Sequence, residues 1–160
     1  MLRMVYFADF HAVMSYCLLI WGHSAIAQRI FALQRKAVRI VGGAGYRDDC
    51  KTLFISLKIM TLPSLYVFRC VQYINKHINQ YTVSGVAHGY NTRNKEDIEC
   101  SYGRINRSRS GVNYWGTKFF NRLPTSVRRM TSKTFDQKVK MCLLENPLYN
   151  KEEFLKANLF

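Results

Sequence analysis

Apolar residues recur at helical spacing between Ser24 and the glycine pair Gly42-Gly43. They follow one another at steps of four, three, four and three residues: Ile26, Ile30, Leu33, Ala37 and Ile40. At about 100° per residue these positions share roughly a quarter of the helix circumference, which predicts an amphipathic helix with this stripe packed inside. Ser24 can cap the start of the helix, and the glycines can end it.

The same helix has a basic side, opposite the apolar stripe. We expect a cationic stripe there, formed by Arg29, Arg35, Lys36 and Arg39. The whole chain has 24 lysine and arginine residues against 10 acidic residues, which gives a formal net charge of +14. Because the phosphate backbone attracts such surfaces, RNA or DNA is the leading candidate partner.

Similar apolar periodicity predicts helices on both sides of this element. Residues 4–21 are expected to form one largely buried helix that ends at Gly22. Either Asp48 or Asp49 is expected to cap a short helix that follows. The remaining helices are expected at 65–79, 116–124 and 132–144, with one or two more helical turns within 149–159.

Composition divides the chain into three segments. Residues 1–79 are predicted to form a small helical bundle, and residues 114–160 a short C-terminal helical unit. Between 80 and 113, glycine, serine, asparagine and arginine replace the apolar periodicity, which indicates a basic loop or linker. The fold is therefore predicted to be mainly α.

Arginines of the linker alternate with tyrosines and asparagines, a mixture that suits RNA or single strands because bases can stack on the rings. A solvated flexible loop is the alternative for this segment. The candidate nucleic-acid-binding residues of the linker are Arg93, Arg104, Arg107 and Arg109.

The sequence gives little support to metal binding or catalysis. The five cysteines are odd in number and form no Cys-x-x-Cys pair, and the four histidines form no i, i+4 pair. We therefore expect no metal site, no cofactor and no catalytic residue. Unpaired cysteines also indicate an intracellular protein, in the cytoplasm and nucleus.

The tetrapeptide Tyr46-Arg47-Asp48-Asp49 has the letters of the reverse transcriptase signature that holds catalytic magnesium. Its context differs, because it follows the glycine-rich stretch 42–45 and no apolar strands flank it. A two-metal site also needs a further carboxylate from an earlier strand. A helix cap is therefore the expected role of these aspartates.

The N-terminal part leaves another class open, that of a basic secreted protein. Arg3, the apolar run 13–21 and the small-residue triplet Ala25-Ile26-Ala27 imitate a secretory signal with its cleavage site. Asp9 and His11 interrupt the approach to that run. The uncharged run from Phe10 to His23 is also shorter than the roughly 20 residues of a membrane span, so no membrane partner is expected.

Short motifs follow one another in a consistent order along the chain: Tyr6-Phe7, Trp21-Gly22, Leu33 to Ile40, Leu57 to Pro63, Asn91-Thr92-Arg93 and Gly116 to Pro124. Over about residues 5 to 155, this series resembles the C-terminal part of the polymerase polyprotein of arthropod jockey-type non-long-terminal-repeat retrotransposons. The resemblance implies a place beyond the catalytic palm of the reverse transcriptase, in the helical thumb and the following segment. Those parts hold the primer–template duplex through its backbone.

The resemblance thus implies a nucleic-acid-binding fragment of an RNA-directed DNA polymerase, with a thumb-like bundle and no activity alone. Fingers, palm, endonuclease and any terminal cysteine–histidine knuckle have no counterpart in these 160 residues. The chain therefore looks like an element remnant, and a non-functional product is one alternative. Another alternative is a protein–protein interaction module, whose helices would otherwise pack on a polymerase palm domain.

Overall fold

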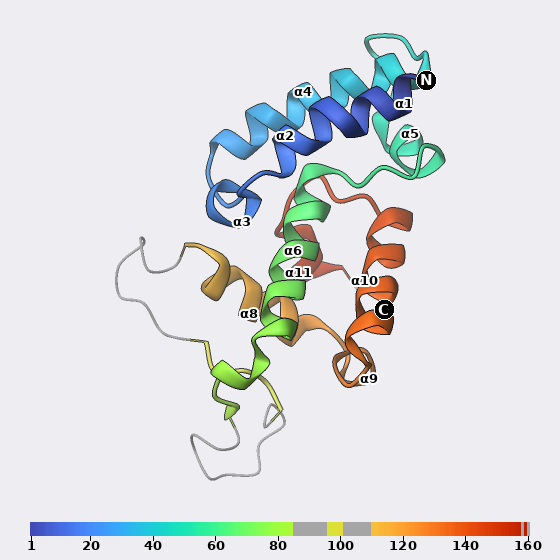
Figure 1. Ribbon diagram of the computed structural model, residues 1–160. Coiled ribbons are helices and arrows are strands. Elements are labelled where there is room, and N and C mark those ends of the chain that lie inside the picture. The colour runs from blue at the N-terminus through green and yellow to red at the C-terminus, as the bar shows by residue number, and fades with distance from the viewer. Residues whose placement is uncertain (85–95, 101–109, 158, 160) are drawn as a thin grey trace.

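A computed structural model describes residues 1–84, 96–100, 110–157 and 159. Within these ranges the regular structure is helical apart from one isolated antiparallel bridge between Val83 and Ile98, so the expected mainly α fold is confirmed (Figure 1). The helices are α1 (Leu2–Val5), the π-helical η1 (Tyr6–His11), α2 (Ala12–Ser15), α3 (Leu18–Trp21), α4 (Ile26–Gly42), α5 (Cys50–Ser56), α6 (Leu62–Lys76), the 3-10 helix η2 (Ile78–Gln80), α8 (Val112–Arg122), α9 (Thr125–Arg128), α10 (Ser132–Glu145) and α11 (Glu153–Lys156).

Helix α6 runs through the middle of the molecule, and α3, α4, α8 and α10 all pack against it. Most of its side chains are buried, and its sequence is accordingly apolar on nearly all sides of the helix. Thr61 caps it: the threonine hydroxyl accepts from the backbone N–H of Ser64 and donates to the carbonyl oxygen of Leu148 at 2.6 Å. The cap thereby ties the C-terminal segment to the N-terminal one, and residues of both segments share one core.

Several predicted helices are confirmed with small shifts of their ends. The patterns at 65–79, 116–124 and 132–144 correspond to α6, α8 and α10. The predicted cap of the short helix α5 is Asp49, whose Oδ1 accepts from the backbone N–H of Lys51 at 3.1 Å. Apolar periodicity therefore identifies most of these helices.

The prediction of one buried helix over 4–21 is wrong. The chain leaves helical geometry at Tyr16, which is extended, and at Cys17, whose φ of 49° lies in the left-handed region. The indole Nε1 of Trp21 donates to the carbonyl oxygen of Tyr16 at 2.8 Å and holds this turn. The stretch is also less buried than predicted, since it exposes Val5, Val13 and Cys17.

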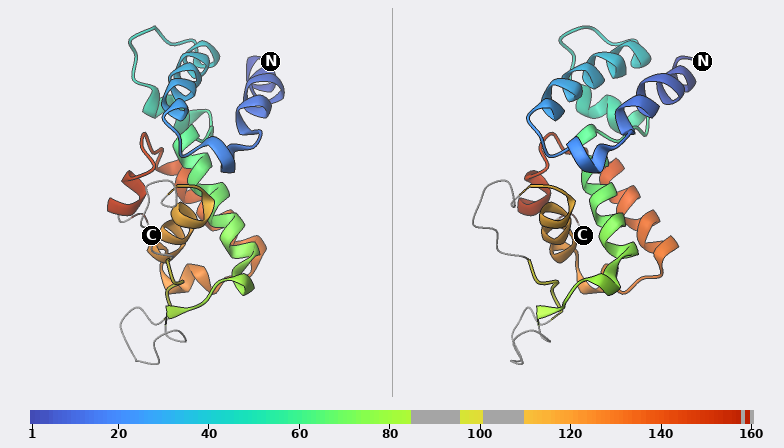
Figure 2. Two further views of the ribbon diagram at one scale, coloured as in Figure 1. Left: turned by 90° about the vertical axis from the view of Figure 1, so that its left-hand side faces the viewer. Right: turned by 60° about the vertical axis from the view of Figure 1, so that its left-hand side comes forward.

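Helix α4 forms as predicted but buries a different face. Its buried side chains are Phe31, Gln34 and Val38, about 100° around the helix from the predicted stripe. In that stripe, the predicted core positions Ile26, Leu33 and Ile40 are 53%, 54% and 68% exposed. Figure 2 shows α4 beside the α1–α2 segment at one end of the molecule, where α6 begins.

The reason for the different face is Gln34, which is fully buried. Its amide Nε2 donates to the phenol oxygen of Tyr6 and to the carbonyl oxygen of Met60, both at 2.9 Å. Its Oε1 accepts from the backbone N–H of Leu62 at 2.7 Å. Because a buried amide is tolerated when its hydrogen bonds are made, the polar residue sits at the centre of the packed face.

Candidate nucleic-acid interface

The four basic residues of α4 do not form a single stripe. Arg29 and Lys36 are exposed and lie seven residues apart, so they share one side of the helix. Arg35 and Arg39 are half-buried. The Arg35 guanidinium lies 5.2 Å from the ring centroid of Phe31, and Arg39 Nε donates to the carbonyl oxygen of Asp48 at 2.9 Å. Only two of the four, Arg29 and Lys36, are exposed.

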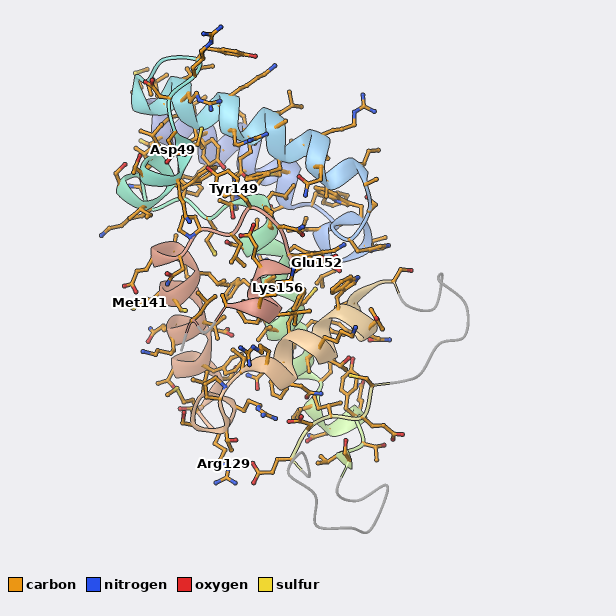
Figure 3. All side chains as sticks on the ribbon, turned by 180° about the vertical axis from the view of Figure 1, so that it is seen from behind. Asp49, Arg129, Met141, Tyr149, Glu152 and Lys156 are labelled. Atoms are coloured by element: carbon orange, nitrogen blue, oxygen red, sulfur yellow. The ribbon has the colours of Figure 1, made fainter. Side chains whose placement is uncertain are left out.

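Arg35 and Arg39 lie where α4 meets α5 and the segment between α10 and α11. Figure 3 shows Tyr149 on that segment, and its ring meets the Phe31 ring edge-on with centroids 5.3 Å apart. Burial raises the pKa of the Cys50 thiol and of the Tyr149 phenol, and the charges of the two arginines oppose this rise. These arginines therefore stabilise an internal junction, which limits their access to a large ligand.

The linker candidates Arg93, Arg104, Arg107 and Arg109 lie outside the described residues. Their proposed role in binding rests on the sequence alone.

A further group of exposed cations lies along the seam between α6 and α10. On α6 they are Arg69 and Lys76, and on α10 they are Lys133 and Lys140. We call these four residues the α6/α10 basic surface. Sequence reasoning missed it as a unit, because each pair looks like an ordinary polar edge of an amphipathic helix until the two helices are brought together.

Gln72 and Asp136 fix the register of this surface. Gln72 Nε2 donates to Asp136 Oδ2 at 2.8 Å, and Arg69 Nη1 donates to Gln72 Oε1 at 3.2 Å. The α6 cations lie three residues before and four after Gln72, and the α10 lysines stand in the same relation to Asp136. Each pair therefore spans about 10 Å along its helix.

The two helices run antiparallel (Figures 1 and 2), so Arg69 lies on the same side of the Gln72–Asp136 contact as Lys140, and Lys76 on the same side as Lys133. Packed helices have axes roughly 8–10 Å apart. The result is two short rows of positive charge around a single carboxylate.

Few cations of the described chain have an acidic partner. Within the described ranges, Arg128 pairs with Asp97 at 2.9 Å and Arg129 with Glu96 at 2.6 Å, and no other lysine or arginine there forms an ion pair. The α6/α10 basic surface is accordingly uncompensated apart from Asp136. Such a surface attracts polyanions.

The two aspartates of the tetrapeptide 46–49 make local contacts. Asp48 Oδ2 accepts from the backbone N–H of Gly45 at 2.7 Å, and Asp49 caps α5. Both side chains belong to exposed residues. Within the part of the chain that the structure describes, no three histidine, cysteine, aspartate or glutamate side chains come close enough to hold a metal ion.

Comparison with protein families, with curated proteins and with solved structures finds no significant match to this chain. Within the described ranges, no helix has both the length and the apolar character needed to cross a bilayer. The support for a function therefore comes from the arrangement of the basic residues and from the ordered motifs of the sequence.

Proposed function

We propose that this chain binds nucleic acid through the phosphate backbone, with the α6/α10 basic surface as its main contact. The observation that carries the proposal is the arrangement of four exposed cations, from two packed helices, around one carboxylate. Arg29 and Lys36 on α4 add a second contact. Contacts of this kind hold a strand in place and carry no direct sequence information.

The dimensions of the surface suit a duplex or a folded RNA. Double-stranded DNA carries one negative charge per about 1.7 Å of its axis, so a patch about 10 Å on each side faces several phosphates. Long lysine and arginine side chains can adjust to phosphates at slightly different spacings. The protein would then bind RNA and DNA of many sequences.

We further propose that the chain is the post-palm part of a retrotransposon reverse transcriptase, inactive as a polymerase by itself. The ordered motifs from Tyr6-Phe7 to Gly116–Pro124 support this, as do the helical fold and the net charge of +14. The local hydrogen bonds of Asp48 and Asp49 agree with a structural role for both carboxylates.

The test measures affinity for a duplex and for a single-stranded RNA as a function of salt. In the test variant, Arg69, Lys76, Lys133 and Lys140 are changed to glutamine. Four phosphate contacts contribute roughly −3.6 to the slope of log affinity against log salt, so the slope should fall by about three to four units. Raising salt from about 50 to 200 mM should cost the parent about a hundredfold more affinity than the variant.

The matched control changes four exposed lysines elsewhere to glutamine: Lys51, Lys58, Lys138 and Lys156. It removes the same net charge and should lower the slope by about one unit or less. Equal slopes for the two variants would mean that binding follows net charge alone, and the proposed surface would then be rejected. Equal slopes for the test variant and the parent would reject it as well.

A further inference from the structure

An open apolar groove of about 740 Å³ lies between the N-terminal helical segment and α4. We call it the N-terminal groove. One wall is formed by Phe10, Val13 and Met14, and the other by Ile26, Ile30 and Leu33 of α4. Tyr16, Cys17 and Trp21 line it at the turn between α2 and α3. Its volume is in the range of sites that bind ligands, about 300–1,000 Å³.

The lining is unusually exposed for apolar side chains. Val13 is 78% exposed and Tyr16 76%, while Ile26 and Leu33 are each more than half exposed. Contiguous apolar surface of this kind on a folded protein marks a place where a partner docks. The groove is separate from the α6/α10 basic surface, because none of its lining residues belongs to α6 or α10.

Internal contacts hold both walls in place. The hydrogen bond from Gln34 to Tyr6 joins the N-terminal segment to α4, and the one from Trp21 to Tyr16 fixes the turn between α2 and α3. A groove with braced walls needs little rearrangement to accept a ligand, which lowers the entropic cost of binding.

The spacing of the α4 wall fits a helix as the occupant. Ile26, Ile30 and Leu33 occupy i, i+4 and i+7, so they form a straight ridge about 10 Å long. An amphipathic helix that lies in a groove presents anchors at the same spacing.

The charges at the rim indicate the character of that helix. Arg29 and Lys36 lie on α4 beside the exposed apolar ridge, and both are exposed. The opposite wall contributes the carboxylate of Asp9. A partner helix with acidic residues along the edge that meets α4 would pair with both cations, whereas a basic edge would be repelled.

A second copy of this chain fits the groove less well. Residues 1–43 contain five lysine and arginine residues and one aspartate, so two copies would bring like charges together across the contact. We propose that the N-terminal groove binds an amphipathic helix of a partner protein, with acidic residues along the edge that faces Arg29 and Lys36.

The experiment measures binding of the full chain to fluorescent helical peptides of about 18 residues. The first peptide has a leucine and phenylalanine face with glutamates along one edge. The second has the same face with lysines at those positions, and the third has the composition of the first with its apolar residues scattered. The first should bind at least tenfold more tightly than either of the others.

Variants of the protein locate the site. The double variant Val13→Asn and Leu33→Asn should weaken binding of the first peptide at least tenfold, and it should fold normally because both side chains are largely exposed. The matched control is Ile20→Asn, 72% exposed and outside the groove, which should change nothing. Changing Arg29 and Lys36 to glutamine should reduce the preference for the glutamate peptide over the lysine peptide.

Cysteine labelling gives a second readout. Cys17 lines the groove, and Cys100 is exposed away from it. The first peptide should slow alkylation of Cys17 at least fivefold and leave Cys100 unaffected.

Three results would overturn the proposal. Binding that the double variant leaves intact would place the peptide outside the N-terminal groove. Equal affinity for the first and second peptides would show that Arg29 and Lys36 do not select a partner with an acidic edge. If the parent protein forms a dimer and the double variant is a monomer, the groove is occupied by a second copy of the chain.

Discussion

The buried amide of Gln34 donates to the phenol oxygen of Tyr6 at 2.9 Å, and this contact joins the N-terminal helical segment to α4. The same amide binds the backbone on both sides of Thr61, at Met60 and Leu62. One side chain thus connects three parts of the chain. Burial raises the pKa of Tyr6, and the hydrogen bond from Gln34 opposes that rise.

The first prediction concerns this contact. Gln34→Leu removes all three hydrogen bonds and leaves buried partners unsatisfied, so it should lower the free energy of unfolding by about 2–4 kcal/mol. Tyr6→Phe removes one bond and should cost about 1 kcal/mol. Urea denaturation of the two single variants and the double variant gives the coupling energy. A coupling near zero would mean that the two side chains do not interact.

The second prediction tests which face of α4 is buried. Phe31 is 2% exposed, so Phe31→Asn should lower the free energy of unfolding by about 3–5 kcal/mol. Leu33 is 54% exposed, so Leu33→Asn should change it by about 0.5 kcal/mol or less. Thermal melts of the two variants are compared. A larger loss of stability in Leu33→Asn than in Phe31→Asn would mean that the apolar stripe predicted from the sequence is the buried face.

The third prediction uses the backbone after α5. Lys58 has a φ of 51°, in the left-handed region that costs a side-chain-bearing residue roughly 1–2 kcal/mol. Lys58→Gly should therefore raise the free energy of unfolding by about 1 kcal/mol. The control is Lys138→Gly inside α10, which should lower it by about the same amount. Destabilisation by both glycines would show that Lys58 is not left-handed.

The fourth prediction concerns pH. Burial lowers the pKa of His11 and of His23 below the usual 6.5, and the charges of Arg69 and Lys151 respectively lower them further. The unfolded chain then binds protons more readily than the folded one, so the free energy of unfolding decreases as pH falls through 6.5. Denaturation curves from about pH 7.5 to 5.5 cover this window. Changing both histidines to glutamine should flatten the dependence, and an unchanged slope would assign it to other groups.

The fifth prediction concerns the aspartates of the tetrapeptide 46–49. Asp49→Ala removes the cap of α5 and should cost about 1 kcal/mol of stability. Neither the parent nor Asp48→Asn should extend a primer on a template with magnesium or manganese. Template-dependent extension by the parent that Asp48→Asn abolishes would make this carboxylate catalytic.

Apolar periodicity was sufficient to predict most helices, because helix formation and burial leave a period that is visible in the sequence. It misidentified the packed face of α4, since a glutamine at the centre of that face looks like a surface residue until its three partners are known. It also missed the break at Tyr16 and Cys17, where the neighbouring residues are all compatible with a helix. The α6/α10 basic surface could not be predicted, because Lys76 and Lys133 are 57 positions apart and come together only through tertiary packing.

The hydrogen bond between Thr61 and Leu148 has a consequence for biosynthesis. Its two residues are 87 positions apart, and two of the helices that cover α6, α8 and α10, leave the ribosome after it. Until α8 and α10 have emerged, the apolar side chains of α6 that these two helices cover remain exposed to water. The core around α6 is therefore completed only after α8 and α10 have been synthesised, which makes the partly made chain prone to aggregation.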